Sequence, residues 1–337
     1  MSGERKSSQR HKRIGDFIAI LLLAGLAMGC PRPASAVERL IFGHILDDST
    51  AHHRNLTWAA EEIQRALKGR YELLVVPRGQ LGTTDAQVVE GFKLKTTQMA
   101  YLSFGHLVDM KSSLSIGAGP FVFRDFEHWQ HFRDSTLYQQ LVAECEKIVD
   151  IKVFGLAYYG QRHVTTRAPL AGPESLKGLA IRVPSIPTMV LTFRALGARP
   201  VPIPFKETYQ ALKEGIIEAQ ENPLPAIKAM RFYEVTPVIN LTAHILDAQL
   251  VVMDGARWRA IPKSDQAALA EIFGVAARRV TDDVRREELE LERWLTGVGA
   301  TLHAIDRKPL AEQVRPSHRE GRFPWSGELY ERIQDLR

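Results

Sequence analysis

Residues 180–203 of the chain read AIRVPSIPTMVLTFRALGARPVPI, and this stretch decides the fold class. It opens with an apolar strand pattern that Pro184 ends, and a helical pattern then runs from about Pro187 to the stop at Gly197. A second extended segment, from Arg199 to Ile203, follows. The stretch therefore predicts a strand, a helix and another strand, which is the repeating unit of an α/β fold.

The same alternation occurs nearer the N-terminus. Leu40 to Leu46 is a β-rich apolar run, a helical pattern follows over residues 56–67, and residues 73–76 are extended. A further helix is predicted around residues 88–94 and a strand at 99–104. We therefore expect an open sheet with helices packed on it, in which ligands bind at the carboxyl ends of the strands.

The clearest single element is a helix predicted from about Asp265 to Thr296, with Gly297 as its stop. Its apolar face comprises Leu269, Ile272, Phe273, Ala276, Val280, Val284, Leu291 and Leu295. Its charged face, with Arg278, Arg279, Asp282, Arg285 and Glu288, is expected to be solvated. At about 1.5 Å per residue such a helix is about 48 Å long, so it should lie along more than one small lobe.

The first 36 residues have the features of an export signal. A basic segment (Arg5, Lys6, Arg10, Lys12, Arg13) precedes an apolar run from Phe17 to Met28, and Ala34-Ser35-Ala36 matches a signal peptidase site. We therefore expect a signal peptide over residues 1–36 and a periplasmic mature protein. Acylation of Cys30 is the less favoured alternative, because Ala27 and Met28 match a lipoprotein signal poorly.

The composition of the chain after residue 36 limits its possible partners and its number of lobes. Six of the 44 basic and two of the 39 acidic residues lie in residues 1–36, which leaves 38 basic and 37 acidic residues. This balance gives no indication of a nucleic-acid partner. About 300 residues suit two lobes of ordinary size, and we expect a monomer. Cys145, the one cysteine after the leader, lies in a helical pattern and is expected to be a buried, unreactive thiol.

Four phrases in the middle of the chain carry a family resemblance. They are Gly160-Gln161-Arg162-His163-Val164-Thr165, Leu176-Lys177-Gly178-Leu179-Ala180-Ile181-Arg182-Val183, Pro200-Val201-Pro202-Ile203-Pro204 and Gln220-Glu221-Asn222-Pro223. In this order and spacing they resemble the substrate-binding proteins of tripartite ATP-independent periplasmic (TRAP) transporters, the DctP-type family. Gly79-Gln80-Leu81-Gly82 and Gly119-Pro120-Phe121-Val122-Phe123 extend the resemblance over nearly all of the chain after the leader.

The resemblance implies an α/β, two-lobed periplasmic binding protein fold with a central cleft, hinge strands and a long helix spanning both lobes. Lobe I is expected to comprise residues 37–159 and about 248–287, and lobe II residues 160–247 and about 288–337. The implied function is an extracytoplasmic receptor that binds a small organic acid and delivers it to the membrane subunits of a TRAP permease. No cofactor or catalytic residue is implied.

The resemblance also assigns ligand-binding residues. Arg182 should bind the ligand carboxylate through its planar fork, with Arg162 as a second cation and Asn222 as a polar anchor. Considered alone, either arginine could instead pair with an acidic residue of its own lobe, or across the hinge in the case of Arg162. Aromatic residues expected to line the rest of the cleft are Phe121, Tyr158, Tyr159 and Phe205.

The sequence gives only weak indications of metal binding, nucleotide binding or catalysis. His44 and the pair His52-His53 lack acidic residues at metal-ligand spacing, so we expect a structural or ligand-contact role for His44 and no metal. The chain contains no dinucleotide fingerprint, P-loop or nucleophile elbow. Two alternatives remain open: a periplasmic enzyme on a similar two-lobed scaffold, and a signalling module that senses the ligand. Arg199, Phe205 and Ala219 depart from residues common in the family and leave the identity of the acid open.

Overall fold

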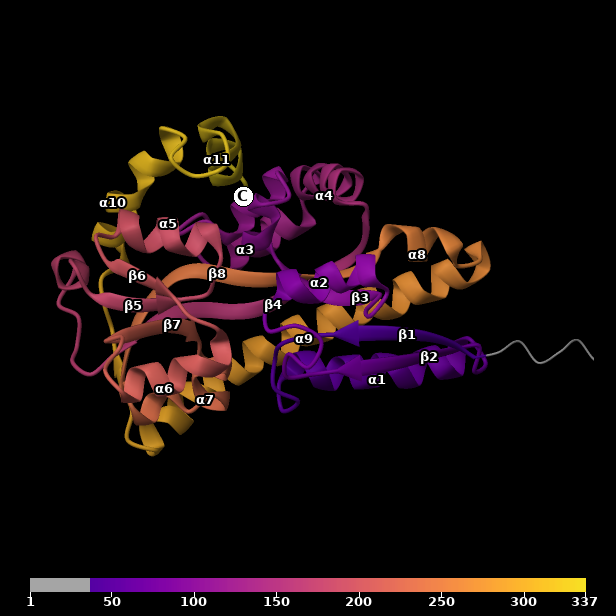
Figure 1. Cartoon of the computed structure of the whole chain (residues 1–337). Coiled ribbons are helices and arrows are strands. Elements are labelled where there is room, and N and C mark those ends of the chain that lie inside the picture. The colour runs from indigo at the N-terminus through magenta and orange to yellow at the C-terminus, as the bar shows by residue number, and fades with distance from the viewer. Residues whose placement is uncertain (1–36) are drawn as a thin grey trace, which may run out of the picture. The chain divides into compact units, whose positions relative to one another are not determined.

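One sheet of nine strands organises residues 37–337, the part of the chain that the computed structural model describes. The predicted signal peptide and Cys30 lie outside the described residues. The strands are β1 (Glu38–Gly43), β2 (Tyr71–Val76), β3 (Met99–Ser103), β4 (Ile151–Thr166), β5 (Ala180–Val183), β6 (Arg199–Pro202), β7 (Ala219–Pro223), β8 (Val238–Asp254) and β9 (Thr301–His303). Their order is β2-β1-β3-β8-β4-β7-β5-β6 (Figure 1). Strand β9 pairs with β8.

Two long antiparallel strands, β4 and β8, join two groups of shorter parallel strands (Figure 1). Strand β3 pairs with residues 249–253 of β8 and carries β1 and β2 beside it. Strand β7 pairs with residues 162–165 of β4 and carries β5 and β6. The part built on β1–β3 is called the first lobe below, and the part built on β5–β7 the second. The two-lobed α/β fold expected from the sequence is therefore confirmed, with β4 and β8 as the connecting strands.

Eleven α-helices cover the sheet and its edges within residues 37–337. They are α1 (Ala51–Ala66), α2 (Asp85–Leu94), α3 (Phe126–Asp134), α4 (Thr136–Val149), α5 (Pro187–Ala195), α6 (Thr208–Lys213), α7 (Leu224–Ala229), α8 (Gly255–Ala260), α9 (Lys263–Gly297), α10 (Arg307–Arg319) and α11 (Gly327–Gln334). Short 3₁₀ helices are η1 (Phe104–Val108), η2 (Ser113–Ala118), η3 (Pro173–Leu176), η4 (Phe205–Glu207) and η5 (Phe232–Glu234). None of these described helices has both the length and the apolar character needed to cross a bilayer.

The long helix predicted from the sequence is α9, which has 35 residues. It contacts α1 in the first lobe, β4 in the middle of the sheet and α7 in the second lobe (Figure 1). All eight apolar positions predicted to face the core are buried. The helix that spans both lobes is therefore confirmed.

One residue on the charged face of α9 contradicts the prediction of a solvated surface. Glu288 is buried, accepts a hydrogen bond of 2.7 Å from the backbone N–H of Gln161, and pairs with Arg285. The reason is a bulge in β4: Gly160 has a φ of +124° at a shift in register, which turns the next backbone N–H toward α9. The carboxylate of Glu288 satisfies this donor.

Two residues of the predicted site lie in strands. Arg162 belongs to β4, which continues to Thr166. Asn222 precedes a proline, a position that favours a turn, but both residues belong to β7 and α7 starts at Leu224. Strand β8 was not among the predicted elements.

Candidate functional site

A cavity of about 640 Å³, which includes space open to solvent, lies where strands of the two lobes end. The first lobe contributes the segment after β1, the start of α2 and the end of β3, and the second lobe contributes the ends of β5, β6 and β7. The polar and aromatic residues that line it are Thr83, Thr84, Asp85, Ser103, His106, Tyr159, Arg162, Arg182, Ser185, Phe205, Asn222, Asp247 and Gln249. Its position at strand carboxyl ends suits a small-molecule ligand.

Five of the six predicted site residues line this cavity: Tyr159, Arg162, Arg182, Phe205 and Asn222. His44, the sixth, does not. It follows β1, is buried, and its Nε2 lies 3.0 Å from Nδ1 of His53. Burial lowers the pKa of His44 to about 3, so its ring is neutral at physiological pH. The geometry places His44 in a structural contact behind the cavity wall.

Two other aromatic residues expected in the cleft lie outside this lining. Tyr158 is buried against Phe126 and Trp129, and its hydroxyl lies 3.3 Å from Glu288. The side chain of Phe121 lies under Arg307. Tyr159 points to the opposite side of β4 from Tyr158, because side chains alternate along a strand, and this places it in the cavity.

Arg182 is a buried cation with few internal partners. It is 2% exposed, its Nε donates to the carbonyl oxygen of Ile203 at 2.8 Å, and its guanidinium carbon lies 5.7 Å from the ring centroid of Phe205. Within residues 37–337, no carboxylate lies within ion-pair distance of Arg182, and its two terminal nitrogens have no hydrogen-bond partner. Burial lowers the pKa of Arg182 to about 10, which still leaves it charged at neutral pH. A buried charge without a counterion is destabilising, so this side chain is suited to bind an anion.

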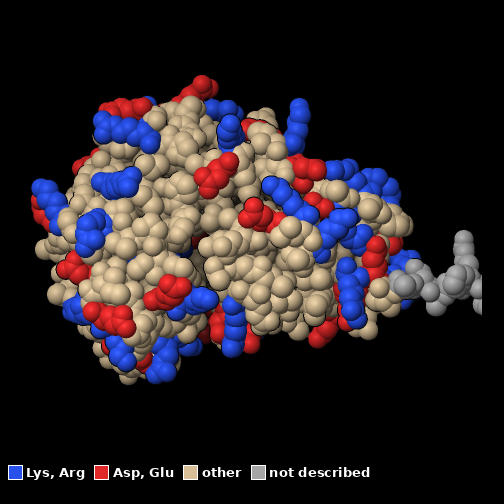
Figure 2. Space-filling view, viewed as in Figure 1, with Lys and Arg blue, Asp and Glu red and all other residues tan. Residues whose placement is uncertain are grey.

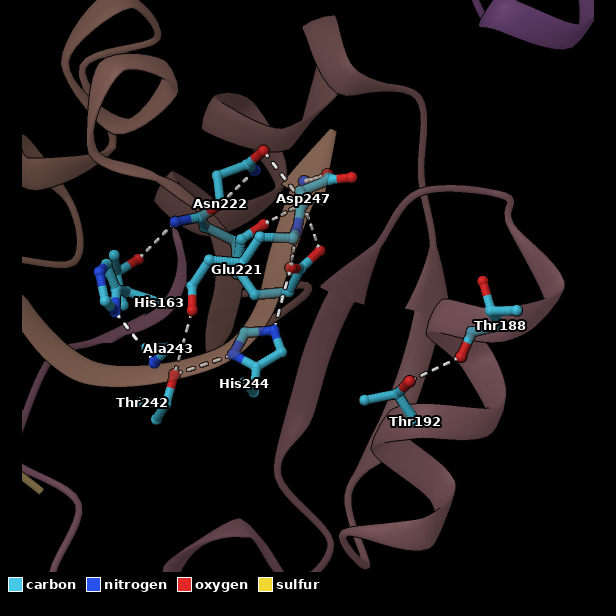
Figure 3. A network of polar contacts seen from close by, with 12 residues as sticks. His163, Thr188, Thr192, Glu221, Asn222, Thr242, Ala243, His244 and Asp247 are labelled. Atoms are coloured by element: carbon cyan, nitrogen blue, oxygen red, sulfur yellow. Dashed lines mark hydrogen bonds and ion pairs between the residues drawn. The ribbon is translucent and has the colours of Figure 1, made fainter. Parts of the chain in front are cut away.

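Arg162, unlike Arg182, is paired with carboxylates of the protein, Glu221 and Asp247, which are labelled in Figure 3. Its Nε and Nη2 donate to the two carboxylate oxygens of Glu221 at 2.5 and 2.8 Å, and its Nη1 donates to Asp247 at 2.7 Å. Its Nη2 also contacts Oδ1 of Asn222 at 3.2 Å. The alternative in which Arg162 pairs with acidic residues is therefore what the structure contains.

Burial and the positive charge of Arg162 together shift the pKa values of the neighbouring titratable groups. Burial would raise the pKa of Glu221, but the charge of Arg162 and a hydrogen bond from His244 outweigh burial and lower it to about 2. Burial raises the pKa of Asp247 although Arg162 opposes this. His244 lies 3.3 Å from Glu221, and Thr242 bonds its other ring nitrogen at 2.8 Å (Figure 3). Burial lowers the pKa of His244, so the ring is neutral.

Asn222 is held inside the same network. Its Nδ2 donates to Oε1 of Gln220 at 2.7 Å, and its Oδ1 accepts from Arg162. Gln220 in turn donates to Thr165 at 2.9 Å. The amide of Asn222 lines the cavity with a fixed orientation, and one N–H of its amide remains available for a ligand.

Eight polar residues of the cavity were not predicted: Thr83, Thr84, Asp85, Ser103, His106, Ser185, Asp247 and Gln249. Asp247 and Gln249 lie on the unpredicted strand β8, and Asp85 is the first residue of α2. One signal for the partner of Arg162 was present, because Glu221 belongs to the same quoted phrase as Asn222. Within the described part of the chain, no cluster of three His, Cys, Asp or Glu residues could hold a metal ion.

Comparison with known proteins identifies the family. Residues 42–322 match the family model of the bacterial extracellular solute-binding proteins, family 7 (DctP). The chain belongs to this family. Members bind solutes, which agrees with the predicted receptor and not with the periplasmic enzyme considered as an alternative.

Individual relatives in the DctP family cover most of the chain. The sialic acid-binding periplasmic protein SiaP of Vibrio cholerae is 27% identical over 90% of this chain and 92% of its own length. The 2,3-diketo-L-gulonate-binding periplasmic protein YiaO of Escherichia coli is 30% identical, over 87% of this chain and 89% of its own length.

Solved structures show the same fold. A TRAP periplasmic solute-binding protein from Bordetella bronchispeptica, with density assigned to pantoate, has a TM-score of 0.83 at 25% identity and covers 89% of this chain and 99% of its own. A TRAP periplasmic solute-binding protein from Haemophilus influenzae with bound L-gulonate also has a TM-score of 0.83, at 22% identity, and covers 89% of this chain and 100% of its own.

Proposed function

We propose that this DctP-family protein binds a small organic acid in the cavity between its lobes, with the carboxylate of the acid on Arg182, and delivers it to the membrane subunits of a TRAP permease. The observation that carries the proposal is Arg182 itself: a buried guanidinium that lines the cavity and whose terminal nitrogens have no partner among residues 37–337. Two parallel hydrogen bonds from such a fork match a carboxylate.

Arg162 supports the site without being the main anchor. The guanidinium of Arg162 already donates to Glu221 and Asp247, so it cannot offer two free parallel N–H donors to a ligand. The network orients Arg162 and Asn222 toward the cavity from β4 and β7. In this proposal Arg182 supplies the charge contact, Arg162 a second polar contact and Asn222 an amide, while Tyr159 and Phe205 provide apolar walls.

The position of the cavity between the lobes supports a mechanism in which the lobes close around the ligand. The cavity takes residues from both lobes, and β4 and β8 are the two long strands that connect them. We assign residues 37–159 and about 248–287 to lobe I, and 160–247 and about 288–337 to lobe II, with the C-terminal helices α10 and α11 close to segments of both. A ligand that contacts both lobes favours the closed state by the contacts that the open state lacks.

The relatives support an acid as the ligand and a transport role. The names of SiaP and YiaO state that they bind sialic acid and 2,3-diketo-L-gulonate, and both ligands carry a carboxylate. Membership of the family and the predicted export signal support uptake through a TRAP permease and a periplasmic location. Basic and acidic side chains are interspersed on the face shown in Figure 2, so that face has no strongly basic patch of the kind that binds nucleic acid.

The test is thermal unfolding of the purified protein against a panel of organic acids, each paired with its amide or methyl ester. A ligand at about 100 times its dissociation constant adds about 2.7 kcal/mol to the free energy of unfolding, which raises the midpoint by a few degrees. The proposal predicts a rise with at least one acid and none with its neutral analogue. Equal rises with an acid and its amide would contradict the role of the carboxylate.

A further inference from the structure

The cavity has a second polar region, on the side of the first lobe. Arg182 and Asn222 come from β5 and β7 of the second lobe, whereas Asp85 begins α2 and Gln249 lies on β8 where β8 pairs with β3. All four residues line the same cavity. A ligand held by Arg182 therefore meets Asp85 and Gln249 on the opposite lobe when the lobes close.

Gln249 presents an acceptor without a partner among residues 37–337. Its Nε2 donates to Oδ2 of Asp85 at 3.3 Å, and the residue is 4% exposed. Its carbonyl oxygen, Oε1, is buried and has no hydrogen-bond partner among the described residues. Buried acceptors are nearly always paired, so an unpaired one in a ligand cavity indicates a donor group on the ligand.

Asp85 complements this acceptor with a donor. It is 4% exposed, and no cation within residues 37–337 forms an ion pair with it. Burial and the charge of Asp247 raise the pKa of Asp85 to about 7, although hydrogen bonds from the Ser103 backbone and Gln249 oppose this. Below that pH the carboxyl group is a neutral acid whose O–H can donate.

The other titratable groups that line the cavity near Asp85 do not explain a change of charge near pH 7. Arg162 and Arg182 are permanent cations in the relevant range, and burial raises the pKa of Tyr159 and lowers that of His106. Asp247 already accepts hydrogen bonds from Arg162 and from the Ala248 backbone. Asp85 is thus the one carboxyl group in the lining that lacks a cationic partner.

We propose that Asp85 and Gln249 together bind a hydroxyl group of the ligand, with the hydroxyl donating to Oε1 of Gln249 and accepting from the carboxyl group of Asp85. This inference rests on the proposed function, because the carboxylate on Arg182 fixes the position of the rest of the ligand. It restricts the ligand to hydroxylated acids and makes the affinity depend on the protonation of Asp85. Ionisation removes the donor and places a second negative charge beside Asp247, so affinity should fall as the pH rises above about 7.

The first experiment compares hydroxy acids with the same acids lacking the hydroxyl groups. Calorimetric titrations use L-gulonate against hexanoate, L-malate against succinate and L-lactate against propionate at pH 6. At least one hydroxy acid should bind ten times more tightly than its partner. Gln249→Leu should weaken that hydroxy acid tenfold or more and its deoxy partner by less than twofold. The matched control Gln140→Leu, on the exposed face of α4, should change neither.

The second experiment tests whether binding depends on the proton of the Asp85 carboxyl group. Wild-type protein should bind the hydroxy acid at least tenfold more weakly at pH 9 than at pH 6. Asp85→Asn, which imitates the neutral acid, should bind within threefold of wild type at pH 6 and lose the pH dependence, whereas Asp85→Leu should bind weakly at both. Asp282→Asn, at an exposed position of α9, should retain the wild-type profile. Unfolding midpoints without ligand show whether each variant is folded.

Three results would overturn the inference. They are equal binding of hydroxy and deoxy acids, an equal loss of both in Gln249→Leu, and a pH-independent affinity in wild type. If acids still bind and Arg182→Ala abolishes their binding, the proposed function stands and only the hydroxyl site is wrong. If no acid binds at all, both fail.

Discussion

Arg162 and Glu221 form a two-point ion pair across neighbouring strands, in which Nε and Nη2 of the arginine donate to both carboxylate oxygens of the glutamate at 2.5 and 2.8 Å. Both residues are at most 4% exposed. Arg182 lines the same cavity without such a partner. The two arginines therefore have different roles: Arg162 is held in place by the protein, and Arg182 is left for a ligand.

Glu221→Gln should destabilise the protein. The change removes one negative charge from a buried pair and leaves Arg162 with Asp247 as its only anion, so the expected loss is about 3 kcal/mol in the free energy of unfolding. Urea unfolding without ligand measures it. Glu290→Gln, at an exposed position of α9, is the matched control and should lie within about 0.5 kcal/mol of wild type. A Glu221→Gln protein as stable as this control would show that the pair is not needed for folding.

Buried neutral histidines should make the protein sensitive to acid. Burial lowers the pKa of His52 to about 3, from 6.5 in an unfolded chain. Between these values the unfolded chain binds a proton that the folded protein does not, so stability falls as the pH drops below 6.5. His52→Phe keeps a ring between Tyr101 and Tyr159 but cannot titrate. From pH 7 to 4.5 it should lose about 2 kcal/mol less stability than wild type. Equal losses in urea unfolding would rule out this contribution.

Local patterns in the sequence were enough to place Arg182. The strand Ala180–Val183 and its stop at Pro184 lie within a few residues of it, and the structure contains that strand with the predicted bounds. The partners of Arg162 could not be placed in the same way, since Glu221 and Asp247 are 59 and 85 residues away. Their contacts depend on the pairing of β4 with β7 and β8, which is a tertiary property.

Strand β8 shows why the rest of the cavity was missed. Its sequence alternates polar and apolar residues over 240–245 and has an apolar run over 250–253, so a strand signal is present. The sequence does not indicate that its polar residues Asn240, Thr242, His244, Asp247 and Gln249 are buried. Their burial depends on hydrogen-bond partners in β4, β7 and α2, which are distant in sequence.

A methyl group at Gly105 should block lobe closure. Gly105 lies in η1 of the first lobe, and an added Cβ would collide with Ile186 and come within 2.8 Å of Oγ1 of Thr188, both in the second lobe. Gly105→Ala should weaken acid binding tenfold or more, since the clash exists only when the lobes meet. The free energy of unfolding without ligand should change by less than about 1 kcal/mol.

The matched control for this change is Gly172→Ala, because no atom lies within 4 Å of the added Cβ at Gly172. It should leave both binding and stability near wild type. A Gly105→Ala protein that loses stability in proportion to its affinity would show that η1 and α5 stay packed in the open state as well.

Cys145 should resist thiol reagents. Its side chain is buried, and burial raises the pKa of its thiol to about 11, so very little thiolate is present at pH 8. Reaction with Ellman's reagent should be at least 100-fold slower in the native protein than in urea. Rapid reaction of the native protein, with residues 1–36 removed, would show that α4 opens readily and that the thiol is accessible.

The most direct test of the account is a calorimetric titration of Arg182→Ala with the organic acid that binds wild type most tightly. Loss of the only charge contact assigned to the ligand carboxylate should cost about 2 to 5 kcal/mol, which is a roughly 30- to 4,000-fold weaker affinity. The control Arg199→Ala, an exposed arginine on the neighbouring strand β6, should bind as wild type does. Binding by a folded Arg182→Ala protein within threefold of wild type would contradict the central claim that this arginine holds the carboxylate.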